Sequence, residues 1–147
     1  DDFWNRRFKI YRDWKRIWYE EYQREGGFSM LTGFRVDGVY SFNDVVNYPI
    51  QGSAFHCLLW CLIQLVKWLK KHKMRSKVVN QIHDSMLVDC AEDEQEALIA
   101  KLVHLMSVAL LKHWDWIIVP MQIEIEVAPA GGSWHQKSKI NLEAYSS

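Results

Sequence analysis

The sequence predicts an α+β fold, with helices packed on a small antiparallel sheet that includes a β-hairpin. Apolar residues recur at helical spacing in several stretches, and Val78–Cys90 is typical of a strand, a tight turn and a second strand. Apolar and polar residues alternate from Met121 to Val127, which predicts a further, half-buried strand. The chain has 147 residues, 49% of them hydrophobic, and a formal net charge of zero. That length suits one modest core, so we expect residues 1–147 to form a single domain.

The first predicted element is a helix from Phe3 to Arg24. Its apolar face consists of residues three or four positions apart, namely Phe8, Tyr11, Trp14, Ile17 and Trp18. We expect Gly26-Gly27 to end this helix. The stretch that follows, "FSMLTGFRVDGVYS", predicts a short hairpin with turns at Thr32-Gly33 and Asp37-Gly38.

The second predicted helix runs from Pro49 to about Lys71, with the proline at its start, where a missing N–H costs little. Its apolar residues follow the helical period: Phe55, Leu58, Leu59, Leu62, Ile63, Val66 and Leu69. His56, Gln64 and Lys67 interrupt this apolar stretch, so we expect a core helix and no membrane span.

Charge is unevenly distributed along the second half of the chain. The stretch from Lys67 to Lys77 holds six Lys or Arg and no acid. It is compatible with a solvated helix end and equally with a phosphate-facing patch. After the predicted hairpin, the acidic turn Glu92-Asp93-Glu94 suits the start of an amphipathic helix. The apolar face of that helix would be Leu98, Leu102, Leu105, Met106, Ala109 and Leu110.

Composition narrows the class of protein. The chain has 8 Trp and few Gly and Pro, which excludes a disordered tail and suggests that some apolar surface faces a partner. Its 3 Cys lack a disulfide-framework spacing, which indicates a reducing, intracellular compartment. Cys57 and Cys61 are interpreted as buried thiols in preference to a metal pair. No signal peptide is predicted, and the start "DDFWNRR" leaves open an experimental fragment, a processed piece or a separately encoded subunit.

Asp84 lies at the bend of the predicted hairpin, directly after His83. A carboxylate held rigidly there would leave the sheet edge, which suits a hard cation such as Mg²⁺. Asp is also a good turn residue, and the hairpin alone favours that interpretation. A second stretch, "NYPIQGSA", places Asn47 and Gln51 on either side of a helix start, beside small residues that would let a bulky partner approach. Ordinary capping residues would give the same pattern.

These motifs together resemble the C-terminal part of family A DNA polymerases, the bacterial DNA polymerase I group. The residues that carry the resemblance are "NYPIQGSA", "VNQIHDSMLV", the Val119-Pro120 pair that leads "MQIEIEV", and the late Trp134. Upstream, "FKIYRDW" and "SMLTGFR" resemble that family's aromatic helix and its "TLxGRR" turn. The resemblance covers roughly Phe3 to Trp134, and the two spaced motifs in the right order make it specific.

The resemblance implies roles for particular residues. In the family this region is the later part of the palm, so Asp84 is expected to be a ligand in a two-metal Mg²⁺ site for nucleotidyl transfer. His83 is expected beside it, near the primer terminus. Asn47 and Gln51 would contact the nascent duplex through the minor groove and sugar, and Arg35 would meet a backbone phosphate. The implied partners are primer-template DNA and deoxynucleoside triphosphates.

The sequence also departs from the family pattern. Ser85 stands where the family usually has Glu, which removes a third acid. Asn43 stands where the family often has Arg, and Phe55-His56 follow "QGSA" where it often has an acid. The family's earlier "D-x-S-x-x-E" stretch and its fingers helix are not found in the sequence. One Asp cannot hold two metals, so we expect the chain to be inactive alone and to be completed by a second polypeptide or a missing segment.

Two other functions fit parts of the sequence. A metal-dependent phosphohydrolase would add ligands from His56, His72, His104 and His113 to the His-Asp pair, but such a pair normally lies on a helix. A non-catalytic duplex-DNA-binding or structural subunit would keep the same fold, although zero net charge disfavours strong autonomous DNA binding. The retained Asp84 disfavours a purely structural role. We expect a cytoplasmic protein without a membrane partner, from a phage in a bacterial host.

Overall fold

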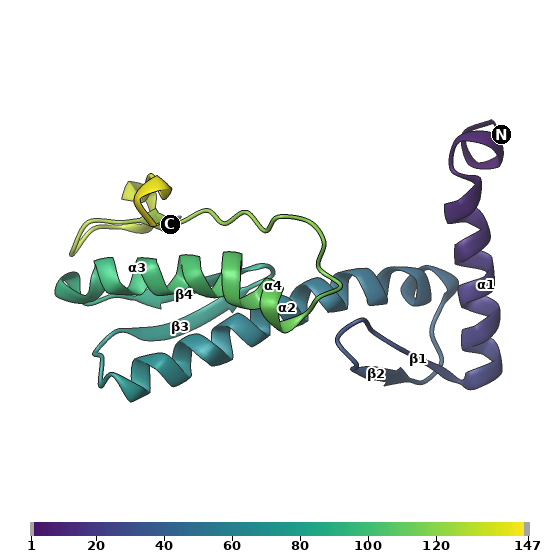
Figure 1. Cartoon of the computed structure of the whole chain (residues 1–147), viewed down its shortest axis with the longest axis horizontal. Coiled ribbons are helices and arrows are strands. Elements are labelled where there is room, and N and C mark those ends of the chain that lie inside the picture. Colours follow the sequence, from purple (N-terminus) through teal and green to yellow (C-terminus); the bar gives the residue numbers. More distant parts are fainter. Residues whose placement is uncertain (1, 146–147) are drawn as a thin grey trace. The chain divides into compact units, whose positions relative to one another are not determined.

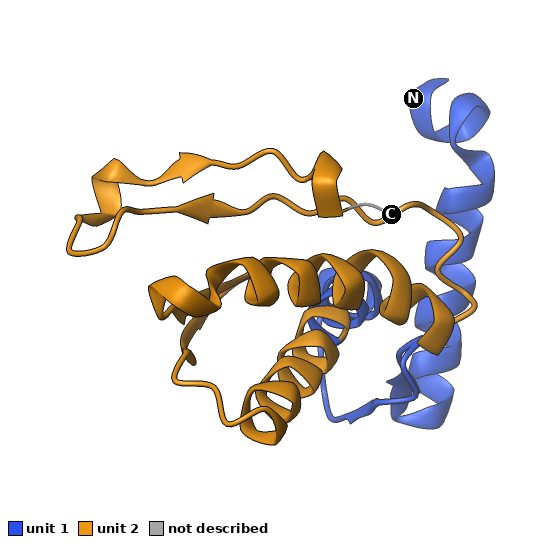
Figure 2. Ribbon diagram, turned by 60° about the vertical axis from the view of Figure 1, so that its left-hand side comes forward, with its two compact units in different colours: residues 1–56 blue, residues 57–147 orange. Residues whose placement is uncertain are grey.

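The structure is a computed structural model that describes residues 2–145. It is α+β, as the sequence predicts, with helices and three separate antiparallel strand pairs in the described chain. The chain divides into two compact units, residues 1–56 and 57–147, which are described separately below (Figure 2). Helix α2 (Phe42–Lys71) contributes residues to both units. The expectation of a single domain stays a prediction.

Unit 1 begins with the predicted aromatic helix. It starts as a π-helical turn, η1 (Phe3–Arg7), and continues as α1 (Lys9–Glu25) after a break at Phe8. Gly26 ends α1 in the left-handed region, with φ of 68°, and its N–H donates to the Tyr22 carbonyl at 2.9 Å. Glycine adopts this conformation at little cost, so the predicted stop is confirmed.

The predicted hairpin of unit 1 is also present. Strands β1 (Gly27–Ser29) and β2 (Arg35–Asp37) pair antiparallel. Tyr22, Phe28 and Val45 form the buried cluster that holds this hairpin against α1 and α2. The Tyr22 hydroxyl donates to the Gly38 carbonyl at 2.8 Å and accepts the Tyr40 N–H at 2.7 Å. These bonds fix the chain at the point where it leaves the hairpin.

Helix α2 starts at Phe42, so the predicted start at Pro49 is wrong. The start is set by Ser41 and Asp44. The Ser41 N–H donates to the Asp44 carboxylate at 3.3 Å, and the Asp44 N–H donates to the Ser41 hydroxyl oxygen at 3.3 Å. Reciprocal bonds of this kind satisfy backbone donors at a helix N-terminus, and here they place it earlier than the proline.

Pro49 therefore lies inside α2. Proline has no N–H to donate to the carbonyl four residues earlier, which here belongs to the buried Val45. The indole Nε1–H of Trp18, on α1, donates to that carbonyl at 2.9 Å. A side chain from another helix thus replaces the missing backbone donor, and α2 continues without an orphaned buried carbonyl.

This replacement is testable. Trp18→Phe removes the donor and leaves the Val45 carbonyl unsatisfied, so we expect the free energy of unfolding to fall by about 1–3 kcal/mol. Pro49→Ala supplies a backbone N–H for the same carbonyl. Trp18→Phe should therefore cost about 1 kcal/mol less in the Pro49→Ala background, as measured by a double-mutant cycle in urea. Strictly additive effects of the two substitutions would contradict the proposed replacement.

Unit 2 is built around one core. Strands β3 (Lys77–Ile82) and β4 (Ser85–Asp89) form the predicted hairpin, with a bulge between Val78 and Asn80. A 3₁₀ turn, η2 (Glu92–Glu94), leads into a continuous helical run: α3 (Gln95–His104), the π-helical turn η3 (Leu105–Ala109) and α4 (Leu110–His113). The core consists of Cys57, Cys61, Leu65 and Leu69 from α2 and Leu98, Leu102, Leu105 and Leu110 from the later helices.

The hairpin packs on this core through Val78, Met86 and Val88. Figure 1 draws the ribbons of β3 and β4 together with those of α2 and α3. Cys57 and Cys61 are buried free thiols, as expected, and burial raises the pKa of Cys61 to about 12. By length and composition alone, α2 would also qualify as a membrane span. This is weak support for a span, because the core helix of a soluble domain passes the same test.

The predicted strand from Met121 to Val127 is mostly wrong. Only Glu126–Val127 is a strand (β5), paired with β6 (Ser138–Lys139); η4 (Trp134–Gln136) and η5 (Glu143–Tyr145) are short 3₁₀ turns. From Met121 to Ile125 side-chain burial alternates as expected, and both of these residues pack on the core. Beside the β5–β6 ladder, the Ile140 N–H donates to the Ile125 carbonyl at 3.1 Å, and within residues 2–145 no other strand is paired with Met121–Ile125. The predicted periodicity is therefore right, and most of the predicted pairing is not formed.

Candidate functional site

The turn of the hairpin β3–β4 carries the His-Asp pair. The predicted tight turn is present: Ile82 pairs with Ser85, so His83 and Asp84 form a two-residue loop. Ser85, which was expected at the bend as well, is the first residue of β4. His83 has a positive φ of 52°, a conformation that short hairpin loops require. The Gln81 side-chain amide donates to the His83 carbonyl, and the Ser85 hydroxyl donates to the Ile82 carbonyl at 2.9 Å. Side chains on both strands therefore close the turn.

Asp84 is exposed at this turn, as is His83. Within the described residues 2–145, its carboxylate has no hydrogen-bond or ion-pair partner. Ser85 stands where the resemblance leads one to expect Glu, and its hydroxyl is used to close the turn. The hairpin thus presents one free carboxylate on a closed loop.

Glu94 anchors the base of this hairpin. Its carboxylate accepts the Arg75 N–H at 2.9 Å, the Ser76 hydroxyl at 2.6 Å and the Ser76 N–H at 2.9 Å. Hydrogen bonds from the Arg75 N–H and from Ser76 lower the pKa of Glu94 to about 2. The Ser76 hydroxyl also accepts the Ala91 N–H at 3.0 Å, so the start of β3 is tied to the segment after β4.

The lowered pKa of Glu94 predicts a pH dependence. A group whose folded-state pKa is depressed contributes stability above its unfolded pKa, which is 4.5 for this side chain, and loses it as pH falls toward about 2. Glu94→Gln should therefore lower the melting temperature at pH 7, and the difference from wild type should shrink between pH 4.5 and pH 2. Thermal scans across this range check it. The exposed Glu96→Gln is the matched control, and an equal loss at pH 7 would contradict the assignment.

A Mg²⁺ site needs several oxygen ligands that lie close together. Among residues 2–145 no group of three His, Cys, Asp or Glu side chains is close enough to hold an ion. Asp84 has the right chemistry for one ligand position, since Mg²⁺ prefers carboxylate oxygens. The described residues therefore fit a contribution to a metal site and do not fit a complete one.

Asn47 and Gln51 lie in unit 1, on the exposed side of α2. They are four residues apart inside the helix, so they share one face. The expectation that they straddle the helix start is wrong, because the Ser41–Asp44 pair starts α2 earlier. Gly52, next to Gln51, allows the Met30 side chain to pack directly against the helix.

Arg35 lies at the start of β2 and is exposed. Its Nε donates to the Asp37 carboxylate at 2.8 Å, and an Nη lies 3.4 Å from the Glu25 carbonyl. These partners hold the guanidinium at the surface and leave donors for an outside ligand. Arg35, Asn47 and Gln51 belong to unit 1, whereas His83 and Asp84 belong to unit 2.

The basic stretch Lys67–Lys77 is exposed at all its lysines. Arg75 is paired with Asp93 and Glu94 of the following segment. A solvated helix end and a phosphate-facing patch both require exposed lysines, so their exposure does not distinguish the two interpretations. The phosphate-facing patch therefore stays a prediction.

Three of the four histidines offered to a phosphohydrolase have partners elsewhere. His56 Nδ1 lies 2.7 Å from the Thr32 hydroxyl, and His72 Nδ1 lies 2.9 Å from the Trp68 carbonyl. His113 stacks on Trp60, with 4.6 Å between ring centroids. With no metal-binding group among residues 2–145, this arrangement gives the phosphohydrolase interpretation no support.

The fold and the motifs define a class of protein. It is an α+β chain in which a β-hairpin presents a carboxylate at its tip, and an earlier helix bears two amide side chains on one face. The family model for DNA polymerase family A matches residues 41–136, which is more than half of the chain. The chain therefore belongs to DNA polymerase family A.

Individual relatives agree with this. The chain is 30% identical over 123 residues to DNA polymerase I of Aquifex aeolicus, covering 80% of this chain and 20% of that protein. It is 39% identical over 62 residues to a DNA polymerase of Bacillus phage SP01, covering 42% of this chain and 7% of that protein. DNA polymerase I of Chloroflexus aurantiacus is 26% identical over 99 residues, 67% of this chain and 10% of that protein. The chain thus spans a fifth or less of the length of these relatives.

Proposed function

We propose that this chain is the C-terminal part of the palm of a template-directed DNA polymerase. In this proposal it supplies one metal-binding carboxylate, Asp84, and contacts to primer-template DNA, with deoxynucleoside triphosphates as substrates. The observation that carries the proposal is the exposed carboxylate of Asp84, which has no partner within residues 2–145 and sits on a closed hairpin turn of a family A chain.

Mg²⁺, when bound, would stabilise the charge that develops on the attacking and leaving oxygens of nucleotidyl transfer. The role of this chain would be to position the Asp84 carboxylate. Side-chain bonds from Gln81 and Ser85 to backbone carbonyls close the turn, so the backbone that carries Asp84 is held in place before any ligand arrives. In this proposal a second carboxylate comes from a segment outside residues 2–145, which is supported by the lack of any group of three potential metal ligands among these residues.

Asn47, Gln51 and Arg35 are proposed as DNA contacts from unit 1, and His83 as a contact and catalytic neighbour of Asp84 in unit 2. The amides of Asn47 and Gln51 offer donors and acceptors on one exposed helix face. Minor-groove acceptors are similar for every correct base pair, so such amides would test pairing without reading sequence. Arg35 would bind a phosphate, which positions DNA.

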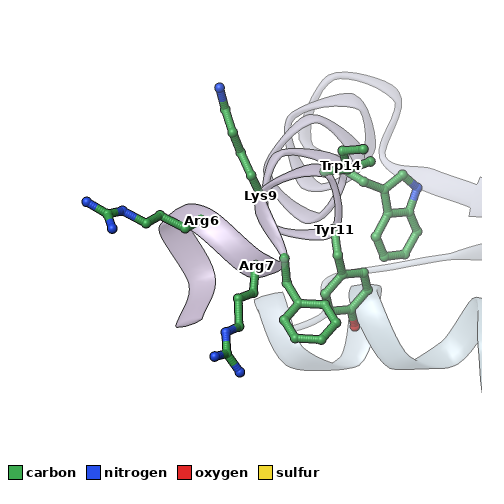
Figure 3. Close-up of a pocket in the computed structure, with 7 residues that line it drawn as sticks. Arg6, Arg7, Lys9, Tyr11 and Trp14 are labelled. Carbon is green, nitrogen blue, oxygen red and sulfur yellow. The ribbon is translucent and has the colours of Figure 1, made fainter. Parts of the chain in front are cut away.

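The remaining palm and fingers are proposed to come from a second polypeptide or a missing segment. The described α1 supports this, because its aromatic face is unusually exposed: Phe8, Tyr11 and Ile17 are each more than a third exposed. Figure 3 shows the rings of Tyr11 and Trp14 on one side of the helix, while Arg6 and Lys9 extend away. They border an open hollow of about 500 Å³. Exposed aromatic side chains grouped beside such a hollow support a contact surface for a partner.

We expect the chain to form a stable complex with the polypeptide that carries the missing motifs. Phe8→Asp should weaken that complex, because it places a charge on the aromatic face, whereas the same change at the fully exposed Val39 should not. Size-exclusion chromatography with light scattering measures both. A stable, active monomer of this chain alone would refute the proposed completion.

Asp84→Asn tests the proposed metal ligand. The change keeps the shape and removes the charge, and phosphoryl transfer depends mainly on positioning and electrostatic stabilisation. In the complete enzyme we expect nucleotide incorporation to slow by at least about a hundredfold, on the order of 3 kcal/mol in the barrier. Thermal stability should stay equal or rise slightly, since the carboxylate has no partner among residues 2–145.

The test is the rate of single-turnover nucleotide incorporation on a primer-template at saturating Mg²⁺. Asp89→Asn, at the opposite end of β4, is the matched control and should retain the wild-type rate. A near wild-type rate for Asp84→Asn would make Asp84 an ordinary turn residue and would favour the non-catalytic, DNA-binding or structural subunit.

A further inference from the structure

Two contacts join the loop of hairpin β1–β2 to helix α2. The Thr32 hydroxyl oxygen lies 2.7 Å from His56 Nδ1, within hydrogen-bond distance. The Met30 side chain packs against Gly52, where a Cβ would collide with its thioether. Gly52 and His56 are four residues apart, so both contacts fall on one face of α2.

The loop between these anchors is closed by its own backbone. The Met30 N–H donates to the Phe34 carbonyl at 2.8 Å, and the Gly33 N–H donates to the Met30 carbonyl at 2.9 Å. The Phe34 ring meets the His56 ring edge-on, with 5.1 Å between centroids. The loop therefore moves as one piece, and its position depends on what holds it to α2.

The strands of the hairpin are packed on the Tyr22–Phe28–Val45 cluster. They are only three residues each, and the loop beyond them contacts α2 through Met30, Thr32 and Phe34. Arg35 directly follows the loop, and Gln51 directly precedes Gly52 on the helix. Both side chains are exposed. Arg35 is next to Phe34, whose ring meets that of His56, and Gln51 is next to Gly52, against which Met30 packs.

We propose that the Thr32–His56 hydrogen bond is a positioning contact that sets the spacing between Arg35 and Gln51, so that both reach one DNA duplex. The inference rests on the proposed function and adds two residues to it. Neither Thr32 nor His56 touches DNA. Both are half-buried, and they act by holding the β1–β2 loop on α2.

The test is the salt dependence of primer-template binding by the complete polymerase. Each phosphate contact to duplex DNA contributes about 0.9 to the slope of log K against log salt. Thr32→Val keeps the shape and removes the hydroxyl, so we expect several-fold weaker binding and a slope lower by about one, as for Arg35→Ala. Thr32→Ser, which keeps the hydroxyl, should bind as wild type.

A double-mutant cycle isolates the contact. The double variant Thr32→Val/His56→Ala should weaken binding no more than the single variant with the larger effect, because both substitutions remove the same bond. His56→Asn, whose amide can still meet the Thr32 hydroxyl, should recover part of the affinity. Additive losses, or a Thr32→Val protein with lower thermal stability but wild-type affinity and slope, would overturn the inference.

Failure of the inference and failure of the proposed function give different results. If Gln51→Ala, Asn47→Ala and Arg35→Ala weaken binding while Thr32→Val does not, the DNA contacts stand and the positioning contact is wrong. If those three variants also bind and discriminate mismatched primer ends like wild type, the proposed DNA face is wrong, and the inference falls with it. Gln23→Ala, an exposed amide on α1, is the matched control.

Discussion

Helix α2 passes through a proline, and it can do so because another helix supplies the hydrogen bond that proline cannot. The Val45 carbonyl is buried in the cluster that organises unit 1, where an unpaired acceptor would be costly. The Trp18 indole satisfies it. With that carbonyl paired, one uninterrupted helix bears Asn47 and Gln51 in unit 1 and Cys61 in the core of unit 2.

The same interaction explains where sequence-based prediction succeeded and where it did not. The hairpin turn at His83 and Asp84 and the end of α1 at Gly26 were predictable, because both depend on neighbouring residues alone. The start of α2 was not, because a proline indicates a helix start unless a distant donor such as Trp18 replaces its N–H. No local pattern reports that donor.

The residues of the candidate site show the same difference between local patterns and contacts with distant segments. The family resemblance pointed to Asp84 and the paired amides as candidates, but not to the groups that support them. Glu94 was predicted only as a favourable residue at a helix start, whereas it accepts three hydrogen bonds from Arg75 and Ser76. Thr32 was predicted only as a turn residue. Such support depends on which segments meet, and the sequence carries no periodic signal for it.

Two carboxylates of unit 2, those of Glu94 and Asp84, show how the fold distributes its polar groups. Glu94 directs its oxygens to donors inside the chain, and its lowered pKa reflects that stabilisation. Asp84 has no such partner among residues 2–145, although Gln81 and Ser85 beside it are both used to close the turn. A carboxylate that is paired within the chain, like that of Glu94, would have to break its own hydrogen bonds before it could bind a cation. A carboxylate without a partner, on a closed turn, has no such cost. The fold therefore uses one acid to hold the hairpin and keeps the other available at its tip.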